Sequence, residues 1–178
     1  ADREPPATRL ASVYDGRAAA IAYAGVQLLR ATGIWEHVKE SQPIRDIRVT
    51  DAESLLFLGF DHRDLGGEPF GNMVENRHLR YAQAKAAAEA NVTQVTGAIS
   101  RLEVRSGCIR AVLDDETEIS TELLVAADGV YSTVRNLAGI STRGWNYDQV
   151  GMVLTICHER PHSGIAHERF FPNGPFAI

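Results

Sequence analysis

The chain has 178 residues, of which 44% are hydrophobic and 23% are charged, and its formal net charge is −5 at pH 7. This composition suits one domain with a hydrophobic core and a smaller annex, and without basic clusters it makes nucleic acid a poor partner. The apolar runs are too short to span a bilayer, and two cysteines are too few for a disulfide scaffold, which favours a reducing compartment.

The first predicted element is a helix over 14–35, with the sequence YDGRAAAIAYAGVQLLRATGIW. Asp15 is a candidate N-cap, apolar residues at helical spacing form a stripe, and Gly33 lies just past the end. Beyond it, residues 44–49 (IRDIRV) and 55–60 (LLFLGF) are separated by the polar sequence TDAES. These two runs predict strands.

A second helix is predicted over 77–90, after a glycine-rich connector at 62–69 and the short extended segment GNMVEN. Asn76 is placed to cap this helix and Asn91 to close it.

Short β-like runs follow the second helix, at residues 92–95, 98–106, 108–113 and 117–120. Turn residues at Ser106-Gly107 and Asp114-Asp115 separate the later runs. The pattern predicts a small antiparallel meander inserted before the next strand.

Residues 123–128, LLVAAD, are apolar until the final acid, which is typical of a strand buried on both faces of a parallel sheet. Residues 148–159 and 165–171 return to extended patterning and predict the beginning of a second sheet. The order of elements favours an α/β fold with an open sheet.

The turn after residues 123–128 is a candidate binding element. Ligands of open α/β sheets lie beyond the carboxyl ends of strands, where Asp128 falls, and Gly129 would allow close approach of the backbone. A helix beginning near Ser132 would direct free N–H groups to a phosphate, and Arg135 could meet an anion. The alternative is purely structural: Asp128 and Ser132 act as caps, and Arg135 is a solvated charge.

The sequence AADGVYSTVR resembles the Asp-Gly fingerprint of the FAD-dependent aromatic hydroxylases, a family of flavoprotein monooxygenases. In that family the turn contacts the FAD pyrophosphate and bears on NAD(P)H use, which implies cofactor contacts at Asp128, Gly129, Ser132 and Arg135. Further segments resemble the ubiquinone-biosynthesis hydroxylase branch in the same order. They are YDGRAAAIAYAGVQLLRATGIWEHV, QPIRDIRVTD, GNMVENRHLR and HERFFPNGPFAI.

The resemblance implies four more cofactor contacts. Asp2 matches the acid that accepts hydrogen bonds from the adenosine ribose, and Arg17 matches an arginine that meets FAD phosphate or the flavin edge. Asn76 matches a polar residue facing the ribityl and phosphate region, and Val95 lies where the family's backbone meets adenine. The structural alternatives are a surface arginine for Arg17, an N-cap for Asn76 and a core valine for Val95.

The implied fold is a partial Rossmann-like FAD-binding domain of the p-hydroxybenzoate-hydroxylase type over 1–144, with an antiparallel insert. Part of the substrate sheet is expected around 45–75, and 145–178 would begin the substrate-binding domain. The family's Gly-x-Gly-x-x-Gly turn and its second Gly-Asp motif have no match in these residues. We therefore expect them to be a fragment that is inactive by itself.

The implied activity is hydroxylation of an aromatic ring, with a polyprenyl phenol of ubiquinone biosynthesis as substrate and NAD(P)H and O₂ as co-substrates. No catalytic residue is named, because FAD supplies the chemistry. A cytoplasmic protein at the inner face of the membrane, together with other ubiquinone-biosynthesis proteins, is expected. The alternatives are a non-catalytic Rossmann-like module and an NAD(P)-dependent dehydrogenase without flavin.

A metal site is a weaker hypothesis for the segment CHERPHSGIAHE, whose candidate ligands are Cys157, His158, His162, His167 and Glu168. Cys157 and His158 are adjacent and would point to opposite faces of a strand. We therefore predict no metal there.

Overall fold

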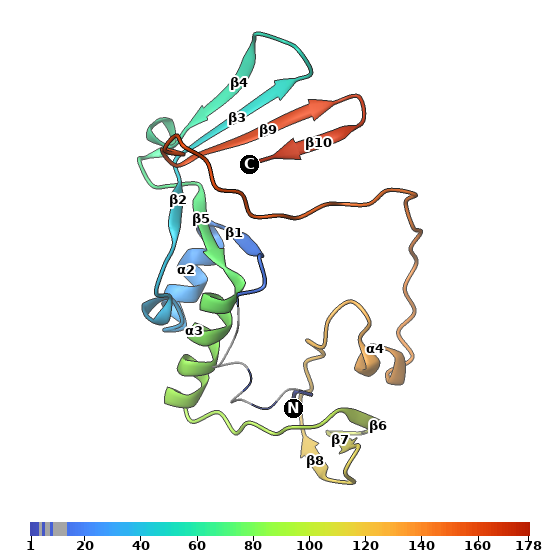
Figure 1. Ribbon diagram of the computed structural model, residues 1–178. Helices are drawn as coiled ribbons and strands as arrows, with labels where there is room; N and C mark the ends of the chain where they lie inside the picture. The colour runs from blue at the N-terminus through green and yellow to red at the C-terminus, as the bar shows by residue number, and fades with distance from the viewer. Residues whose placement is uncertain (4, 6–7, 9–13) are drawn as a thin grey trace. The chain divides into compact units, whose positions relative to one another are not determined.

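The computed structural model describes residues 1–3, 5, 8 and 14–178, which belong to two compact units (Figure 1). Unit 1 comprises Ala1–Arg9 and Val92–Gly151, and unit 2 comprises Leu10–Asn91 and Met152–Ile178. Both units combine helices with β-sheets, which confirms the predicted α/β class.

A three-stranded antiparallel sheet forms one part of unit 2. Its central strand is β5 (Gly71–Glu75), which pairs with β1 (Ala18–Ala22) on one side and β2 (Gln42–Ile44) on the other. Helix α2 (Tyr23–Ala31) follows β1 directly, and α3 (Asn76–Glu89) follows β5 directly. Both helices pack against β5, and the buried side chains are those of Val26, Val74, Ala82 and Ala84.

The predicted helix over 14–35 is wrong in its first half. Residues Ala18–Ala22 form β1, and helix α2 begins only at Tyr23, after the N-cap Ala22. Alanine favours helices, but that preference is small and the hydrogen-bonded ladder to β5 overrides it. The end of the helix is as predicted, with Gly33 in the left-handed region at φ 72°.

The second helix agrees with its prediction, apart from its cap. The N-cap is Glu75, which makes no side-chain capping bond, and Asn76 is the first helical residue. Asn91 follows the helix with φ 53°, the left-handed conformation that asparagine tolerates. At this end the His37 Nε2 lies 3.0 Å from a carboxylate oxygen of Glu89, which ties the 3₁₀ helix η1 (Trp35–His37) to α3.

A four-stranded sheet forms the other part of unit 2, in the order β10 (Gly174–Ala177), β9 (Ile165–Phe171), β3 (Asp46–Asp51), β4 (Phe57–Asp61). The β3–β9 pair is parallel and the other two pairs are antiparallel. The strands predicted around 44–49, 55–60 and 165–171 are confirmed, whereas 148–159 forms no strand. A short 3₁₀ helix, η2 (His62–Leu65), follows β4.

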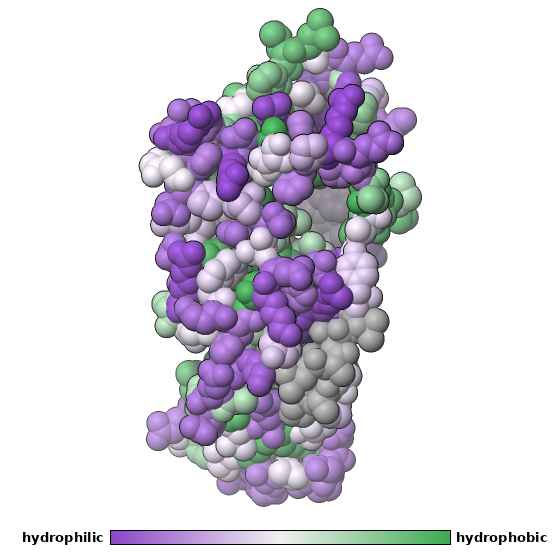
Figure 2. All heavy atoms as spheres, turned by 60° about the vertical axis from the view of Figure 1, so that its left-hand side comes forward, coloured by the Kyte–Doolittle hydropathy of each residue, from purple (hydrophilic) through white to green (hydrophobic). Residues whose placement is uncertain are grey.

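The register gathers apolar side chains on one face of this sheet. Paired residues share a face, which here contains Ile47, Val49, Leu58, Phe60, Ala166 and Phe170, together with the acids Asp51 and Glu168. Leu58 is 60% exposed and Phe170 is 48% exposed. The β3–β4 turn also carries exposed leucines at 55 and 56, and Figure 2 shows hydrophobic surface at this end, at the top of the view.

Unit 1 contains the predicted antiparallel meander, formed by β6 (Ile99–Arg105), β7 (Cys108–Leu113) and β8 (Glu118–Thr121). The last three residues of β7 are buried and form the core with Val134 of the short helix α4 (Thr133–Leu137), which packs against β6. Residues 92–95 are not a strand, although Thr96 forms an isolated parallel bridge with Asp2.

Residues 123–128 do not form the predicted buried strand. They have no regular secondary structure, and Leu123 and Val125 are each 74% exposed. A strand of a parallel sheet needs a neighbouring strand as its hydrogen-bond partner, and no strand in the described part of the chain pairs with this segment.

None of the helices in the described ranges combines the length and the apolar character that crossing a membrane requires.

Gly71 is expected to be the least replaceable glycine of unit 2. An added Cβ would lie 2.3 Å from the Ile21 carbonyl oxygen, which is backbone and cannot rotate away. Gly71→Ala should lower the free energy of unfolding by about 1–3 kcal/mol, as measured by urea denaturation. Gly144→Ala is the control, because nothing lies within 4 Å of its Cβ position. Equal stability of the two variants would contradict the strand register.

Candidate functional site

The turn at Asp128 is built around its carboxylate. Ser132 donates its hydroxyl to Oδ1, and the backbone N–H groups of Thr133 and Val134 donate to Oδ2 at 2.7 and 3.1 Å. Ser132 is the N-cap of α4, and its Oγ accepts the N–H of Arg135 at 3.0 Å. Asp128 therefore caps the helix together with Ser132, as the structural alternative predicted.

The electrostatics of this cap favour a charged Asp128. The hydrogen bond from Ser132, followed by that from the Val134 N–H, lowers the pKa of the Asp128 carboxyl. Because the folded state lowers this pKa, the ionised Asp128 contributes to the stability of the fold. That contribution is complete above the ordinary carboxyl pKa and is lost as the pH falls through the lowered pKa. The carboxylate is thus ionised and fully engaged by its own helix at neutral pH.

The backbone between Asp128 and Ser132 presents donors to solvent. Gly129 has φ 88°, a conformation that favours glycine, and a Cβ there would meet nothing within 4 Å. Its carbonyl accepts the Ser132 N–H at 3.1 Å. Among the described residues, no acceptor pairs with the N–H groups of Gly129 and Val130. An exposed turn with free N–H groups suits an anionic or strongly polar ligand.

Arg135 lies over the same turn. Its Nη2 donates to the Val130 carbonyl oxygen at 3.0 Å, which folds the side chain back along the loop. Its Nε is buried and has no hydrogen-bond partner within the described part of the chain. The Nη1 group also has no acceptor among the described residues, so the guanidinium keeps donor capacity beside the free N–H groups of the turn.

Asp2 and Val95 also lie side by side in unit 1. The Asp2 N–H donates to the Val95 carbonyl oxygen at 2.9 Å, and the Gly97 N–H donates to the Asp2 carbonyl oxygen at 2.9 Å. Arg3, which the sequence interpretation missed, donates from Nη2 to the Thr133 hydroxyl at 3.1 Å. The N-terminal residues therefore reach the beginning of α4, next to the Asp128 cap.

Arg17 and Asn76 are adjacent in unit 2. The Asn76 N–H donates to the Arg17 carbonyl oxygen at 3.0 Å, where α3 begins. Asp15, predicted as an N-cap, instead accepts the Arg17 backbone N–H and its guanidinium at 2.9–3.2 Å. Arg80 on α3 also lies 3.7 Å from the Asp15 carboxylate. Hydrogen bonding to Arg17 is the main cause that lowers the pKa of Asp15.

The eight predicted residues are divided between the two units, and within them the structure pairs Asp2 with Val95 and Arg17 with Asn76. Unit 1 contains Asp2, Val95, Asp128, Gly129, Ser132 and Arg135, and unit 2 contains Arg17 and Asn76. Sequence reasoning missed Asp15 as an arginine partner and missed Arg80 and Arg3 altogether. Two signals were present in the sequence. The Asp-x-Arg spacing pointed to Asp15 as the partner of Arg17, and Arg80 lies one helical turn after Asn76.

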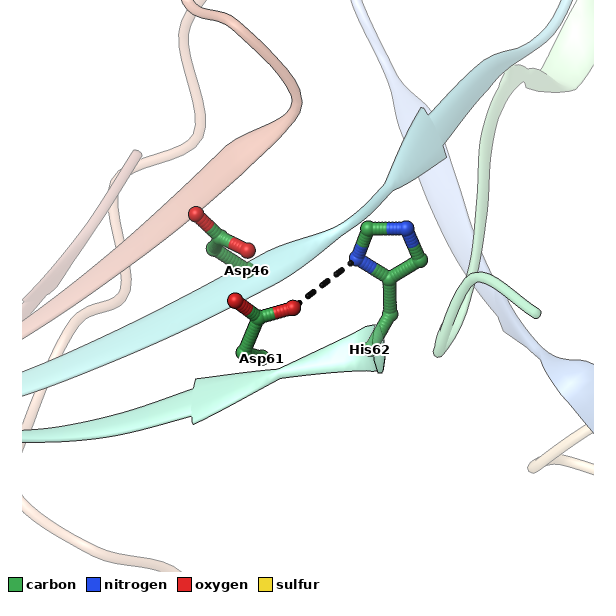
Figure 3. Close-up of side chains that lie close together, drawn as sticks. All are labelled: Asp46, Asp61 and His62. Atoms are coloured by element: carbon green, nitrogen blue, oxygen red, sulfur yellow. Dashed lines mark ion pairs between the residues drawn. The ribbon is translucent and has the colours of Figure 1, made fainter. Parts of the chain in front are cut away.

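Asp46, Asp61 and His62 are the group in the described ranges whose ligand atoms lie close enough for a metal ion, all within 4.8 Å of one another (Figure 3). Asp46 and Asp61 are cross-strand partners on β3 and β4, and the His62 Nδ1 lies 3.4 Å from Asp61. Arg63 already pairs with the Asp61 carboxylate and is the main cause that lowers its pKa. This guanidinium offsets the repulsion between the two opposed acids, so the group is an ion-pair cluster.

The histidine-rich segment of unit 2 shows no convergence of ligands among the described residues. The His162 Nδ1 accepts the Gly164 N–H at 3.0 Å, which uses one ring nitrogen in a local turn. His167 and Glu168 are neighbours on β9 and point to opposite faces of the sheet.

Comparison with known proteins agrees with the expected resemblance to ubiquinone-biosynthesis hydroxylases. The chain is 43% identical to the ubiquinone hydroxylase UbiL of Rhodospirillum rubrum over 180 residues, covering 99% of this chain and 42% of UbiL. It is 32% identical to the ubiquinone biosynthesis monooxygenase COQ6 of Rattus norvegicus, covering 96% of this chain and 38% of COQ6. The chain thus spans about two fifths of the length of these relatives.

A solved structure, that of a PqsL variant from P. aeruginosa, shares the fold with a TM-score of 0.62 at 20% identity, covering 82% of this chain and 40% of PqsL. The family model described as "FAD binding domain" matches residues 8–171. Because that match extends over most of the sequence, the chain belongs to the FAD-binding domain family.

Proposed function

We propose that the full-length protein is an FAD-dependent monooxygenase that hydroxylates an aromatic ring with NAD(P)H and O₂. The family match over residues 8–171 supports the cofactor, and the 43% identity to a ubiquinone hydroxylase supports the reaction. Because the chain spans 42% of that relative, the activity is proposed for the full-length protein rather than for these 178 residues alone.

The observation that carries the proposal is the Asp128 turn. A pyrophosphate is bound by N–H donors and cations, and this turn offers the free N–H groups of Gly129 and Val130 beside the Arg135 guanidinium. The Asp128 carboxylate would repel a phosphate, but its acceptor capacity is directed to Ser132 and the first turn of α4. The donor set of the turn therefore fits FAD, with Asp128 and Ser132 holding the loop in shape.

The other unit 1 residues would bind the adenosine part of FAD. The Asp2 backbone is fixed by its two hydrogen bonds, to Val95 and from Gly97, and this fixes the place from which its carboxylate would accept ribose hydroxyl protons. Val95 lies next to it and would present its backbone to adenine.

The unit 2 residues offer a second set of donors. Arg17 would supply its charged fork to a phosphate oxygen, and the Asn76 side chain stands at the beginning of α3 with no hydrogen-bond partner among the described residues. An amide there can donate to and accept from the hydroxyls of a ribityl chain.

When bound, FAD would supply the redox chemistry, in which NAD(P)H provides the electrons, one oxygen atom of O₂ enters the substrate ring and the other leaves as water. The chain's own contribution would be to bind and orient the cofactor and to exclude water from it. We assign no catalytic acid or base to the described residues.

A polyprenyl phenol is the proposed substrate, by analogy with the relatives named for ubiquinone biosynthesis. The apolar face of the four-stranded sheet supports it, because Leu58, Phe60 and Phe170 are exposed there and could cover an isoprenoid tail. A substrate of this kind partitions into lipid, so we propose that the enzyme works peripherally at the inner face of the membrane, alongside other proteins of the same pathway.

The full-length protein is expected to purify with flavin absorbance and to oxidise NAD(P)H faster when a polyprenyl phenol is added. Absorbance spectra, NAD(P)H consumption and mass spectrometry of a hydroxylated product check this. NAD(P)H oxidation without flavin would favour a dehydrogenase instead, and a colourless protein without redox activity would favour a non-catalytic module.

Asp128→Ala should weaken FAD binding about tenfold, because the Gly129 turn loses the carboxylate that orders it. The measurement is titration of the flavin-free full-length protein with FAD. The control is Asp115→Ala, since Asp115 accepts the Thr117 N–H at 2.9 Å in a turn of the meander and has no proposed cofactor role. Unchanged flavin occupancy in the Asp128 variant would reduce that residue to a helix cap.

A further inference from the structure

The Asp15 carboxylate makes an unusually complete set of contacts with Arg17. Its Oδ1 accepts the Arg17 backbone N–H at 3.1 Å, and its Oδ2 accepts Nε at 3.2 Å and Nη2 at 2.9 Å. The Arg17 carbonyl oxygen meanwhile accepts the Asn76 N–H at 3.0 Å. Both the backbone and the side chain of Arg17 are therefore held.

Asp15 itself lies in a loop that is anchored on both sides. The Tyr14 hydroxyl donates to the Thr155 hydroxyl at 2.6 Å, and that hydroxyl donates to the Gly16 carbonyl oxygen at 3.1 Å. Gly16 has φ 75°, which lets the chain turn back so that the Arg17 N–H faces the acid. The Arg77 guanidinium also lies 5.1 Å from the centre of the Tyr14 ring.

The arginine donors that Asp15 does not take remain available. It engages Nε and Nη2 of Arg17, so the two N–H groups of Nη1 are not used by this carboxylate. Arg80 adds a second cation, whose Nη2 lies 3.7 Å from the same Asp15 oxygen. One acid thus gathers two guanidinium groups at the beginning of α3 and leaves a net positive charge.

Stability alone does not explain this arrangement. The Arg17 side chain is 63% exposed, and exposed ion pairs contribute little to folding. An arginine fork that is already oriented, in contrast, loses less side-chain freedom when it binds a phosphate.

We propose that Asp15 is a positioning residue, which orients the Arg17 guanidinium to bind the phosphate groups of FAD. The inference rests on the proposed function, and it adds an acid that contacts no cofactor itself. Positioning and simple electrostatics predict opposite changes in FAD affinity when Asp15 loses its charge. Removing a negative charge beside two arginines would strengthen binding of an anion if charge alone mattered, whereas loss of positioning weakens it.

The experiment is FAD titration of the flavin-free full-length protein, followed by the quenching of flavin fluorescence. Asp15→Asn should weaken binding about tenfold, because the neutral amide no longer forms the charge-assisted bonds with the fork. In an Arg17→Lys background the same change should have little further effect, since an ammonium group has no fork to orient. Such non-additivity is what a residue acting through Arg17 requires.

A matched control is present in the chain. Asp61 accepts the backbone N–H and the guanidinium of Arg63 with the same Asp-x-Arg spacing, on the four-stranded sheet. Asp61→Asn changes the charge equally and should leave FAD affinity unchanged. Thermal unfolding of the flavin-free variants checks that Asp15→Asn is no less stable than Asp61→Asn.

Three results would overturn the inference. They are equal or tighter FAD binding by Asp15→Asn, an equally large effect in the Arg17→Lys background, and a loss of affinity that Asp61→Asn reproduces. A wild-type protein that binds no FAD would instead contradict the proposed function, and the inference would fall with it.

Discussion

The pairing of β1 with β5 is the constraint on which the candidate site of unit 2 depends. The ladder runs from Ala22 opposite Gly71 to Ala18 opposite Glu75, and the next backbone bond joins Arg17 to Asn76. Gly71 is required at the end of this ladder, because an added Cβ would lie 2.3 Å from the Ile21 carbonyl oxygen. Since α3 begins where this ladder ends, the arginine and the helix start are brought together by strand pairing alone.

Two acids organise donors in the same way in the two units. Asp128 orders a glycine turn through Ser132 and the first turn of α4, and Asp15 orders an arginine through its backbone and its guanidinium. Neither carboxylate is suited to touch a phosphate, because like charges repel. Each instead uses its charge on neighbouring donors, and other N–H groups of the same segments are left without an acceptor among the described residues.

The four-stranded sheet joins segments that are far apart in the chain. Strand β3 pairs in parallel with β9, so that Asp46 lies opposite Ile165 and Ile47 opposite Ala166. The resulting face is largely apolar and partly exposed, because alternation within each strand and the register between strands place these side chains together. Residues 123–127 are also apolar, and Leu123 and Val125 are exposed, because a central strand acquires its hydrogen bonds only from neighbours on either side.

Local patterns in the sequence determined the meander, α3 and the Asp128 turn, because turn residues, helical periodicity and a Ser132 cap act over a few neighbouring residues. Local preference misled for Ala18–Ala22, where alanines indicated a helix, and for 123–128, where an apolar run indicated a strand. Only the tertiary structure decided these elements and the grouping of Arg17 with Asn76, since strand pairing depends on partners distant in sequence.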